Sequence, residues 1–301
     1  MPGAGHIVHM PAHIYQRVGR YEDVIKVNIQ AAKADEDYIT QCRAQGIYPL
    51  AYYPHNLHFI WMGATATGQG KLALDSAKRL AAAIPHAALK DVPILQGFVV
   101  VPYWAMVRFE KWDDILAEPA PHHDTPFTRG AWHYARAMAS IGKGQLEAAE
   151  QELAQLRKFA SDPALDTQTT FSTNTGTAIL RIAPEVVAGR IAAARKDWDT
   201  ATLHLDRAIR YEDALVYQEP QDWHAPVRQD LGNVLLAAGR PAEAEVAFWE
   251  DLKRNPENGW SLKGLALSLA QQRRTEEAAA VEQQLAKAWQ HADVQLVASR
   301  F

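Results

Sequence analysis

Histidine is the residue type whose spacing in this sequence most clearly suggests chemistry. Five of the twelve histidines lie within the first 58 residues, about a fifth of the chain. His6, His9 and His13 are separated by three and four residues, and His55 and His58 repeat the spacing of three. On an α-helix, offsets of three and seven residues keep side chains within about 60° of one face. The spacing therefore predicts two helices that present imidazole groups on one face each.

Clustered imidazoles are typical ligands of transition metals. Neutral imidazole nitrogens favour Zn, Cu, Ni or Fe, whereas Mg and Ca prefer oxygen ligands. We therefore expect a divalent transition metal as the cofactor, held by His6, His9, His13, His55 and His58. A single histidine on a helix is more often an ordinary surface or core residue. The hypothesis thus depends on the five imidazoles lying together.

A second group of candidate residues lies in the proline- and aromatic-rich stretch 217–226, YQEPQDWHAP. A carboxylate and an imidazole on one loop can act as acid and base or complete a metal shell. Glu219 and His224 are therefore the candidate catalytic residues. Nearby aromatic and amide side chains are candidates for binding a ligand, although packing is their more ordinary role. The ligand-binding candidates are Tyr52, Asn56, Trp132, His133, Tyr217 and Trp223.

Seven copies of one pattern must position these residues. In each copy a tight turn is followed by an amphipathic helix, whose apolar positions fall at spacings of three and four, and a short apolar helix precedes the turn. Pro11 and Pro102 lie inside two of these preceding helices, where proline removes a backbone donor, so those helices should be kinked or start late. The turns begin at Gly19, Gly68, Glu110, Gly144, Lys196, Gly239 and Arg273.

The repeated helix–turn–helix unit resembles the tetratricopeptide repeat, which has small residues where its two helices cross. The copy beginning at Ala225 matches best, with Gly232, Gly239, Ala244 and Phe248 in register. The resemblance implies an all-α fold, a right-handed helical-repeat solenoid of about seven helix pairs. It also implies that the first helix of each pair lines a concave groove, and that the histidine cluster lies in this groove.

Two stretches longer than ordinary repeat linkers interrupt the array, at residues 38–53 and 160–176. The second is rich in Thr and Ser and is expected to form a surface loop. It divides the predicted array into an N-terminal subarray, residues 1–160, and a C-terminal subarray, residues 161–301. Phrases such as GHIVHMPAHIY and YPHNLHF resemble the C-terminal part of larger bacterial tetratricopeptide proteins, which raises the expectation that the chain is part of a longer one.

Composition and charge argue against several partners. With 31 Lys and Arg against 35 Asp and Glu the formal charge is −4, so the chain lacks the basic field that nucleic acid attracts. The most apolar stretch, residues 94–107, is too short to cross a bilayer. The single cysteine forbids an intrachain disulfide and, with an N-terminus unlike a signal peptide, predicts a cytoplasmic location. We expect neither nucleic acid nor membrane as a partner; a homo-oligomer is compatible with the sequence.

Three functions agree with these residues and this fold class. The first is a repeat protein whose His-rich groove binds a metal and a small molecule or peptide. The second is a metal-dependent enzyme of hydrolase or oxygenase type that uses the same groove. The third is a protein–protein interaction scaffold. The resemblance weakens one version of the third, because chaperone-tail receptors of this family carry Lys, Arg and Asn in the groove, where this chain offers histidine.

Overall fold

The computed structural model describes residues 4–43, 48–122, 125–170 and 173–298. Within these ranges the regular elements are helices, and one isolated β-bridge joins Thr169 to Thr175. The expected all-α class is therefore confirmed. No helix in the described ranges is both long enough and apolar enough to cross a membrane.

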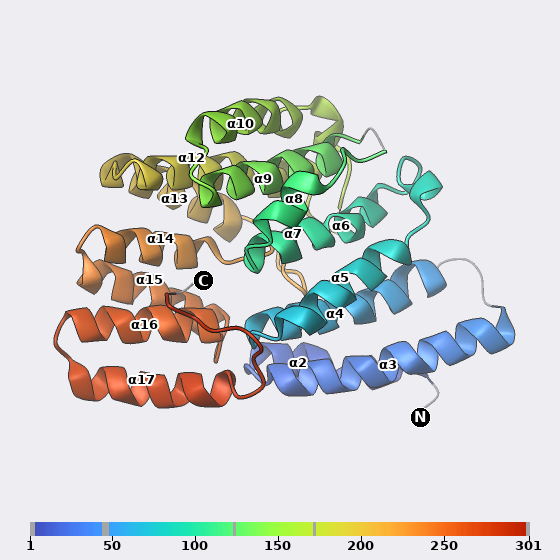
Figure 1. The fold of residues 1–301 in the computed structure, drawn as a ribbon. Coiled ribbons are helices and arrows are strands. Elements are labelled where there is room, and N and C mark those ends of the chain that lie inside the picture. Colours follow the sequence, from blue (N-terminus) through green and yellow to red (C-terminus); the bar gives the residue numbers. More distant parts are fainter. Residues whose placement is uncertain (1–3, 44–47, 123–124, 171–172, 299–301) are drawn as a thin grey trace.

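The helices follow one another along the chain, joined by tight turns within a pair and by longer segments, such as 83–95 and 214–226, between some pairs (Figure 1). In order they are α1 (Gly5–His9), α2 (Pro11–Arg17), α3 (Tyr21–Cys42), α4 (Tyr53–Ala66), α5 (Gly70–Ala82), α6 (Gln96–Val99), α7 (Val101–Arg108), α8 (Trp112–Ala117), α9 (Pro126–Gly142), α10 (Leu146–Ala160), α11 (Gly176–Leu180), α12 (Ile182–Ala194), α13 (Trp198–Asp213), α14 (Val227–Ala237), α15 (Pro241–Arg254), α16 (Gly259–Gln271) and α17 (Thr275–Ala288). Shorter turns are the π-helical η1 (Tyr48–Tyr52) and the 3₁₀ turns η2 (His86–Ala88), η3 (Pro93–Leu95) and η4 (Pro163–Asp166).

The same turn closes the first helix of all seven predicted units. In each, a residue with positive φ follows the helix, and the next backbone N–H bonds back to a carbonyl five residues earlier, as in a Schellman motif. Four of these residues are glycine, which adopts positive φ without strain. The positive-φ residues are Gly19, Gly68, Glu110, Gly144, Lys196, Gly239 and Arg273, which confirms the register predicted from the sequence.

The two helices of a pair differ in how much of their surface is buried. In α12, the first helix of the fifth pair, nine of thirteen residues are buried. In its partner α13, the buried residues are Ala201, Leu205 and Ala208, on one stripe at helical spacing. The first helix of this pair is therefore covered on most sides by neighbouring elements, whereas the second presents its polar face to solvent.

The expected helix breaks at Pro11 and Pro102 are confirmed, because a new helix begins at or just before each proline. Helix α1 ends at His9 and α2 begins at Pro11, while α6 ends at Val99 and α7 begins at Val101 with Pro102 in its first turn. The interruption expected at residues 38–53 is only partly irregular, because α3 continues to Cys42 and η1 covers Tyr48–Tyr52. The remainder of it, residues 44–47, lies outside the described residues.

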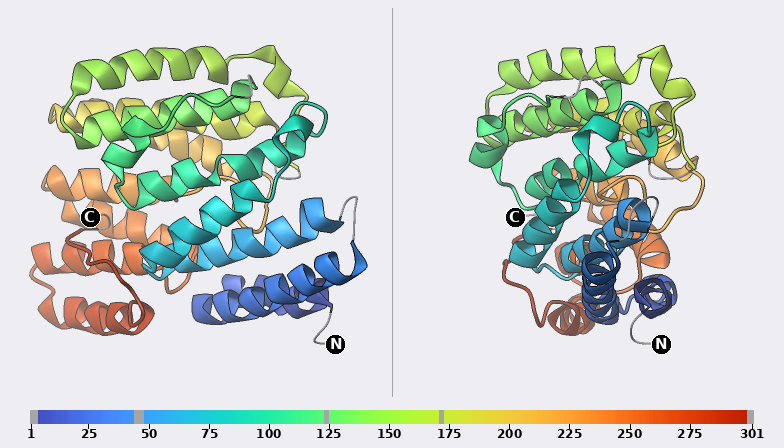
Figure 2. Two further views of the ribbon diagram at one scale, coloured as in Figure 1. Left: turned by 45° about the vertical axis from the view of Figure 1, so that its right-hand side comes forward. Right: turned by 90° about the vertical axis from the view of Figure 1, so that its right-hand side faces the viewer.

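The array curves until its last pair meets its second (Figures 1 and 2). Trp260 on α16 donates its indole N–H to the carbonyl of Thr65 on α4, at 2.7 Å. After α17, the Asp293 carboxylate accepts bonds from the backbone N–H groups of Gly70 and Lys71, at 2.6 and 2.9 Å. These two N–H groups belong to the first turn of α5, where a carboxylate is favoured. The curvature therefore brings residues about 200 positions apart into contact.

Residues 217–226 lie against helices from both halves of the array, namely α2, α7 and α9. Trp223 and His224 are buried there, and their rings contact Trp104 on α7 and Tyr134 on α9. The largest cluster of buried apolar residues runs from Ile25 to Trp260 and includes Trp223. The middle of the segment, at Trp223, is thus part of the core, whereas Tyr217 at its start is exposed. The division into two subarrays stays a prediction.

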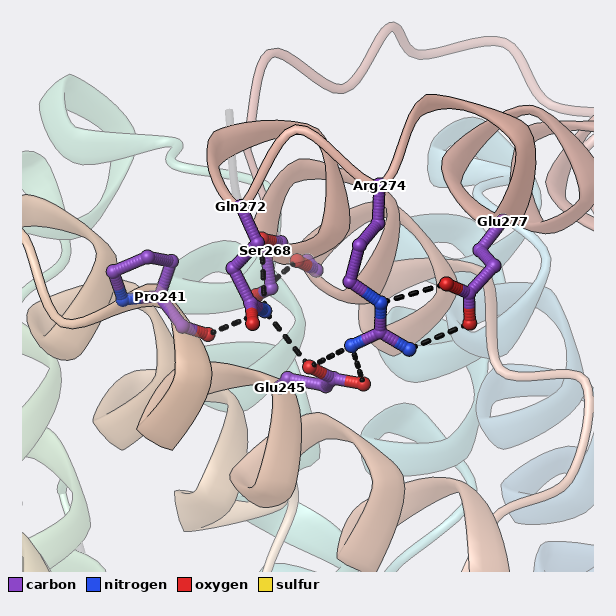
Figure 3. A network of polar contacts seen from close by, with 7 residues as sticks. Pro241, Glu245, Ser268, Gln272, Arg274 and Glu277 are labelled. Carbon is purple, nitrogen blue, oxygen red and sulfur yellow. Dashed lines mark hydrogen bonds and ion pairs between the residues drawn. The ribbon is translucent and has the colours of Figure 1, made fainter.

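Polar contacts join the last two pairs on their outer side (Figure 3). Arg274, just before α17, donates to both carboxylate oxygens of Glu245 on α15 at 2.7 Å, and also to Glu277. Gln272 bonds the same Glu245 at 2.8 Å and the backbone carbonyl of Ser268 at 3.2 Å. One carboxylate on α15 thereby fixes the turn between α16 and α17.

Gly232 provides a test of the helix packing. An added Cβ would lie 2.4 Å from the ring of the buried Phe248, which Gly264 contacts from the facing helix α16. We expect Gly232→Ala to lower the free energy of unfolding by roughly 1–3 kcal/mol, because the ring has no room to move. Denaturant unfolding measures this change.

Gly144→Asn is the control. Gly144 has φ +72° and no atom within 4 Å of an added Cβ, and Asn tolerates positive φ. We expect its effect to stay below about 1 kcal/mol. Equal stability losses in the two variants would contradict the proposed close packing at Gly232.

Candidate metal centre

Three of the five predicted metal ligands lie together at the start of the array. One nitrogen each of His9 on α1, His13 on α2 and His55 on α4 lies within 4.8 Å of the others. The ring centroids of His9 are 4.7 Å from His13 and 4.8 Å from His55, and all three rings pack on Phe59. The break before Pro11 therefore does not separate His9 from His13.

Asn28 on α3 fixes the orientation of His9. The Asn28 side-chain N–H donates to the carbonyl of Val24 at 2.8 Å, so its oxygen is the atom that faces His9. That oxygen lies 2.7 Å from His9 Nδ1 and can only accept a proton. His9 Nδ1 must therefore carry the hydrogen, which leaves Nε2 with a free lone pair. This assignment follows from the hydrogen-bond partners, since they determine the tautomer.

Glu219 fixes the orientation of His13, as Asn28 does for His9. Its Oε2 accepts from His13 Nδ1, and its Oε1 accepts from the hydroxyl of Tyr217. The carboxylate comes from the 217–226 segment and thus crosses the curve of the array. With Nδ1 as the donor, His13 Nε2 also presents a lone pair, unless this imidazole takes up a second proton.

The two lone pairs face each other. His9 Nε2 and His13 Nε2 are 2.9 Å apart, which is a repulsive arrangement unless a cation or a shared proton lies between them. A metal with bonds of about 2.0–2.1 Å to each nitrogen holds two imidazoles about 2.9–3.4 Å apart. Donation of the second ring N–H to a carboxylate or carbonyl oxygen is also the usual support of a metal-bound histidine. The geometry fits a metal site.

Burial keeps His9 and His55 in the neutral form that metals require. Burial lowers the pKa of His9 to about 4, with the hydrogen bond to Asn28 acting in the opposite direction. Burial also lowers the pKa of His55 well below its ordinary value, and the neighbouring histidines lower it further. At neutral pH both rings are therefore uncharged and able to bind a metal ion without losing a proton.

His6 lies beside the group rather than in it. Its ring centroid is 6.0 Å from that of His9 and 4.6 Å from that of Tyr52. The predicted binding residue Tyr52 thus covers His6. Asn56 is buried and donates to Asp35 at 2.7 Å, so it supports α3 from within the core.

His58 occupies a different environment from His55. It is buried, its ring stacks on Trp61 at 5.3 Å, and it meets Phe98 edge to face at 5.7 Å. Its nitrogens are not part of the group that spans 4.8 Å. The two histidines differ by three helix positions, about 60° around the axis, and that rotation turns His58 toward α6.

Trp132 and His133, both on α9, contact different neighbours outside the histidine group. His133 Nδ1 lies 2.6 Å from Glu152 on α10, and its ring stacks on Phe159. Trp132 packs under Arg136 and donates to the carbonyl of Glu118, after α8. The structure therefore does not bring them to the histidine group.

The predicted catalytic pair is divided between two places. Glu219 joins the histidines, whereas His224 stacks on Trp104 at 5.4 Å and lies 3.0 Å from the Tyr134 hydroxyl. Trp223 is buried beside His224, and Tyr217 lies under Arg17. The stretch that the sequence singled out contributes to two separate sites.

Asn28 is the functional residue that sequence patterns did not reveal. It follows His9 by 19 residues, and the same separation joins His133 to Glu152 and Glu185 to His204. In three pairs, therefore, a polar residue on the first helix meets one on the second helix 19 positions later. A search for polar partners at this separation would have found Asn28.

The buried histidines make stability sensitive to acid. Burial lowers the pKa of His58 to about 3, against 6.5 for a free imidazole. Between these values the unfolded chain binds a proton that the folded chain does not, so stability is lost as pH falls from about 6.5 to about 3. We expect His58→Phe to make the free energy of unfolding fall less steeply over this range. Urea titrations at several pH values measure the slope; a slope equal to that of the wild type would contradict the prediction.

Comparisons with known proteins add no second source of information about this site. No protein-family model matches the chain, and the search of curated proteins found no match. The assignment of a function therefore depends on the geometry of the side chains.

Proposed function

We propose that this chain is a tetratricopeptide-like, right-handed repeat protein that binds a transition metal through His9, His13 and His55. The carrying observation is the 2.9 Å approach of His9 Nε2 and His13 Nε2, each opposite an Nδ1 that faces an oxygen acceptor. Zn, Cu, Ni and Fe all suit such a nitrogen set. Glu219 and Asn28 hold the imidazoles in position rather than contacting the metal.

Three protein ligands leave a coordination position for a further molecule. Structural zinc sites are closed by four protein ligands, whereas catalytic sites keep three and an open position. In this proposal the open position takes a donor atom of a small molecule or peptide. The partly exposed His13, with 29% of its side chain accessible, lies on the accessible side of the group.

The open position also favours a second candidate function, a metal-dependent hydrolase. A metal-bound water loses a proton near neutral pH, which supplies a nucleophile. The Tyr217 hydroxyl, which donates to Glu219, could orient a substrate beside the histidines. Purified protein that binds zinc but cleaves no ester or phosphate substrate would support a binding function over this alternative.

Zinc titration with matched histidine variants tests the metal site. We expect one zinc ion per chain in the wild type, and loss of this binding in the double variant His13→Ala with His55→Ala. Asn28→Leu and Glu219→Gln should weaken binding by roughly 10- to 100-fold, because each removes the support of one imidazole. Competition against a chromogenic chelator measures the affinities.

His58→Phe is the matched control on the same helix as His55. Its ring packs between Trp61 and Phe98, so zinc affinity should stay within about threefold of the wild type. The proposal fails if the double histidine variant binds zinc as tightly as the wild type, or if the wild type binds none.

A further inference from the structure

A cavity that is separate from the histidine group lies on the inner side of the array. It measures about 50 Å³, is partly open to solvent, and is lined by residues of α2, α3, α4, α7, α16 and the segment 217–226. Gln16 lies one helical turn after His13, and Pro220 directly follows Glu219, so the cavity is close in sequence to the histidine group. His9, His13 and His55 do not line the cavity.

Five lining side chains have a buried polar atom with no hydrogen-bond partner among the described residues. Four of these residues have small exposed fractions: 8% for Gln16, 2% for Trp61, 8% for Thr65 and 9% for His224. The fifth residue is Arg108, on α7. The atoms are Gln16 Oε1, Trp61 Nε1, Thr65 Oγ1, Arg108 Nε and His224 Nδ1. Since buried polar atoms are nearly always paired, such a concentration indicates a site that holds a polar ligand or ordered water.

Arg108 gives the cavity a positive charge. Its guanidinium lies 3.6 Å from the ring centre of Trp260 and donates to the neutral amide of Gln229 at 2.7 Å. Burial lowers its pKa to about 10, so it remains charged at neutral pH. Among the described residues it forms no salt bridge with a carboxylate, although Asp230 and Asp251 act on it from a distance. A buried cation that no carboxylate contacts is costly, so an anion in direct contact with Arg108 is favoured here.

The unpaired atoms specify more than charge. Arg108 Nε and Trp61 Nε1 are donors and match a carboxylate, while Gln16 Oε1 is an acceptor and matches a hydroxyl. Thr65 Oγ1 can serve either part. At about 10–15 Å³ for each water-sized position, the cavity has room for a molecule of a few heavy atoms.

We propose that this cavity binds a small hydroxycarboxylate, with the carboxylate recognised by Arg108 and Trp61 and the hydroxyl by Gln16. Water alone would pair the polar atoms, but it would leave the Arg108 guanidinium without a carboxylate in direct contact. The aromatic rings of Trp61, Trp223 and Trp260 form apolar walls for the carbon atoms of the ligand. The proposal does not depend on a metal at the histidine group.

Tryptophan fluorescence tests the proposal, because three tryptophans line the cavity. The full chain, stripped of metal with a chelator and then desalted, is titrated with glycolate and lactate. The matched neutral compounds are glycolamide and lactamide. We expect at least one hydroxycarboxylate to change the fluorescence saturably, and its amide to bind at least tenfold more weakly. No saturable change, or equal binding of acid and amide, would show that the cavity holds water only and overturn the proposal.

Variants locate the binding. Arg108→Met should weaken it by at least tenfold, and the milder Thr65→Val by about three- to tenfold. Arg136→Met is the matched control, because Arg136 also lies over a tryptophan, Trp132, but does not line the cavity. Wild-type affinity in both cavity variants would overturn the proposal.

His13→Ala separates this cavity from the metal site. It should keep hydroxycarboxylate binding while losing part of the zinc affinity. Loss of hydroxycarboxylate binding in His13→Ala, with Arg108→Met unaffected, would place the acid at the histidine group and overturn the assignment to the cavity.

Discussion

The packing of the segment 217–226 against the inner helices, with Asp222, Trp223 and His224 buried, is the constraint on which both candidate sites depend. Repeat arrays bury one face of each helix pair on the next pair, which leaves the inner side of the curve without a partner. Here that side is closed by one segment, whose Trp223 is buried among the rings of α7 and α9. Consecutive parts of this segment face different surroundings: Glu219 meets the histidines, and His224 meets the cavity.

Hydrogen-bond acceptors, rather than the histidines alone, give the first site its chemistry. Asn28 and Glu219 each present an oxygen to an Nδ1 atom, so the two Nε2 atoms are turned toward each other. The electrostatic repulsion between the lone pairs of His9 Nε2 and His13 Nε2 opposes their close approach, and a cation between the two nitrogens would remove this repulsion. His133 and His204 also meet carboxylates, but among the described residues neither belongs to a group of three close ligand atoms. A carboxylate partner alone therefore does not make a histidine a metal ligand.

The fold was more predictable from sequence than the sites were, for a physical reason. The seven turns depend on local contacts within a few residues, so Gly19 and even Lys196 could be placed correctly. That the side chains of His9 and His13 lie on the same side also follows from helical spacing. The different surroundings of His55 and His58 depend on which side of α4 meets α6. The role of Arg108 depends on its contact with Trp260, which lies 152 positions later in the chain. Local patterns carry no information about such contacts.

Asn174 and Glu212 hold the segment in place independently of either site. Asn174, within the stretch that the sequence predicted to be a surface loop, exchanges two hydrogen bonds with the backbone of Val216 and donates to Asp222 at 2.6 Å. Glu212 accepts from the backbone N–H of Val227 at 3.1 Å, just beyond the other end. The segment is thus fixed at its start, middle and end by contacts that involve neither the histidines nor Arg108. These contacts anchor the backbone that carries Glu219 and His224, and a backbone anchored in this way lowers the entropic cost of binding a ligand at either site.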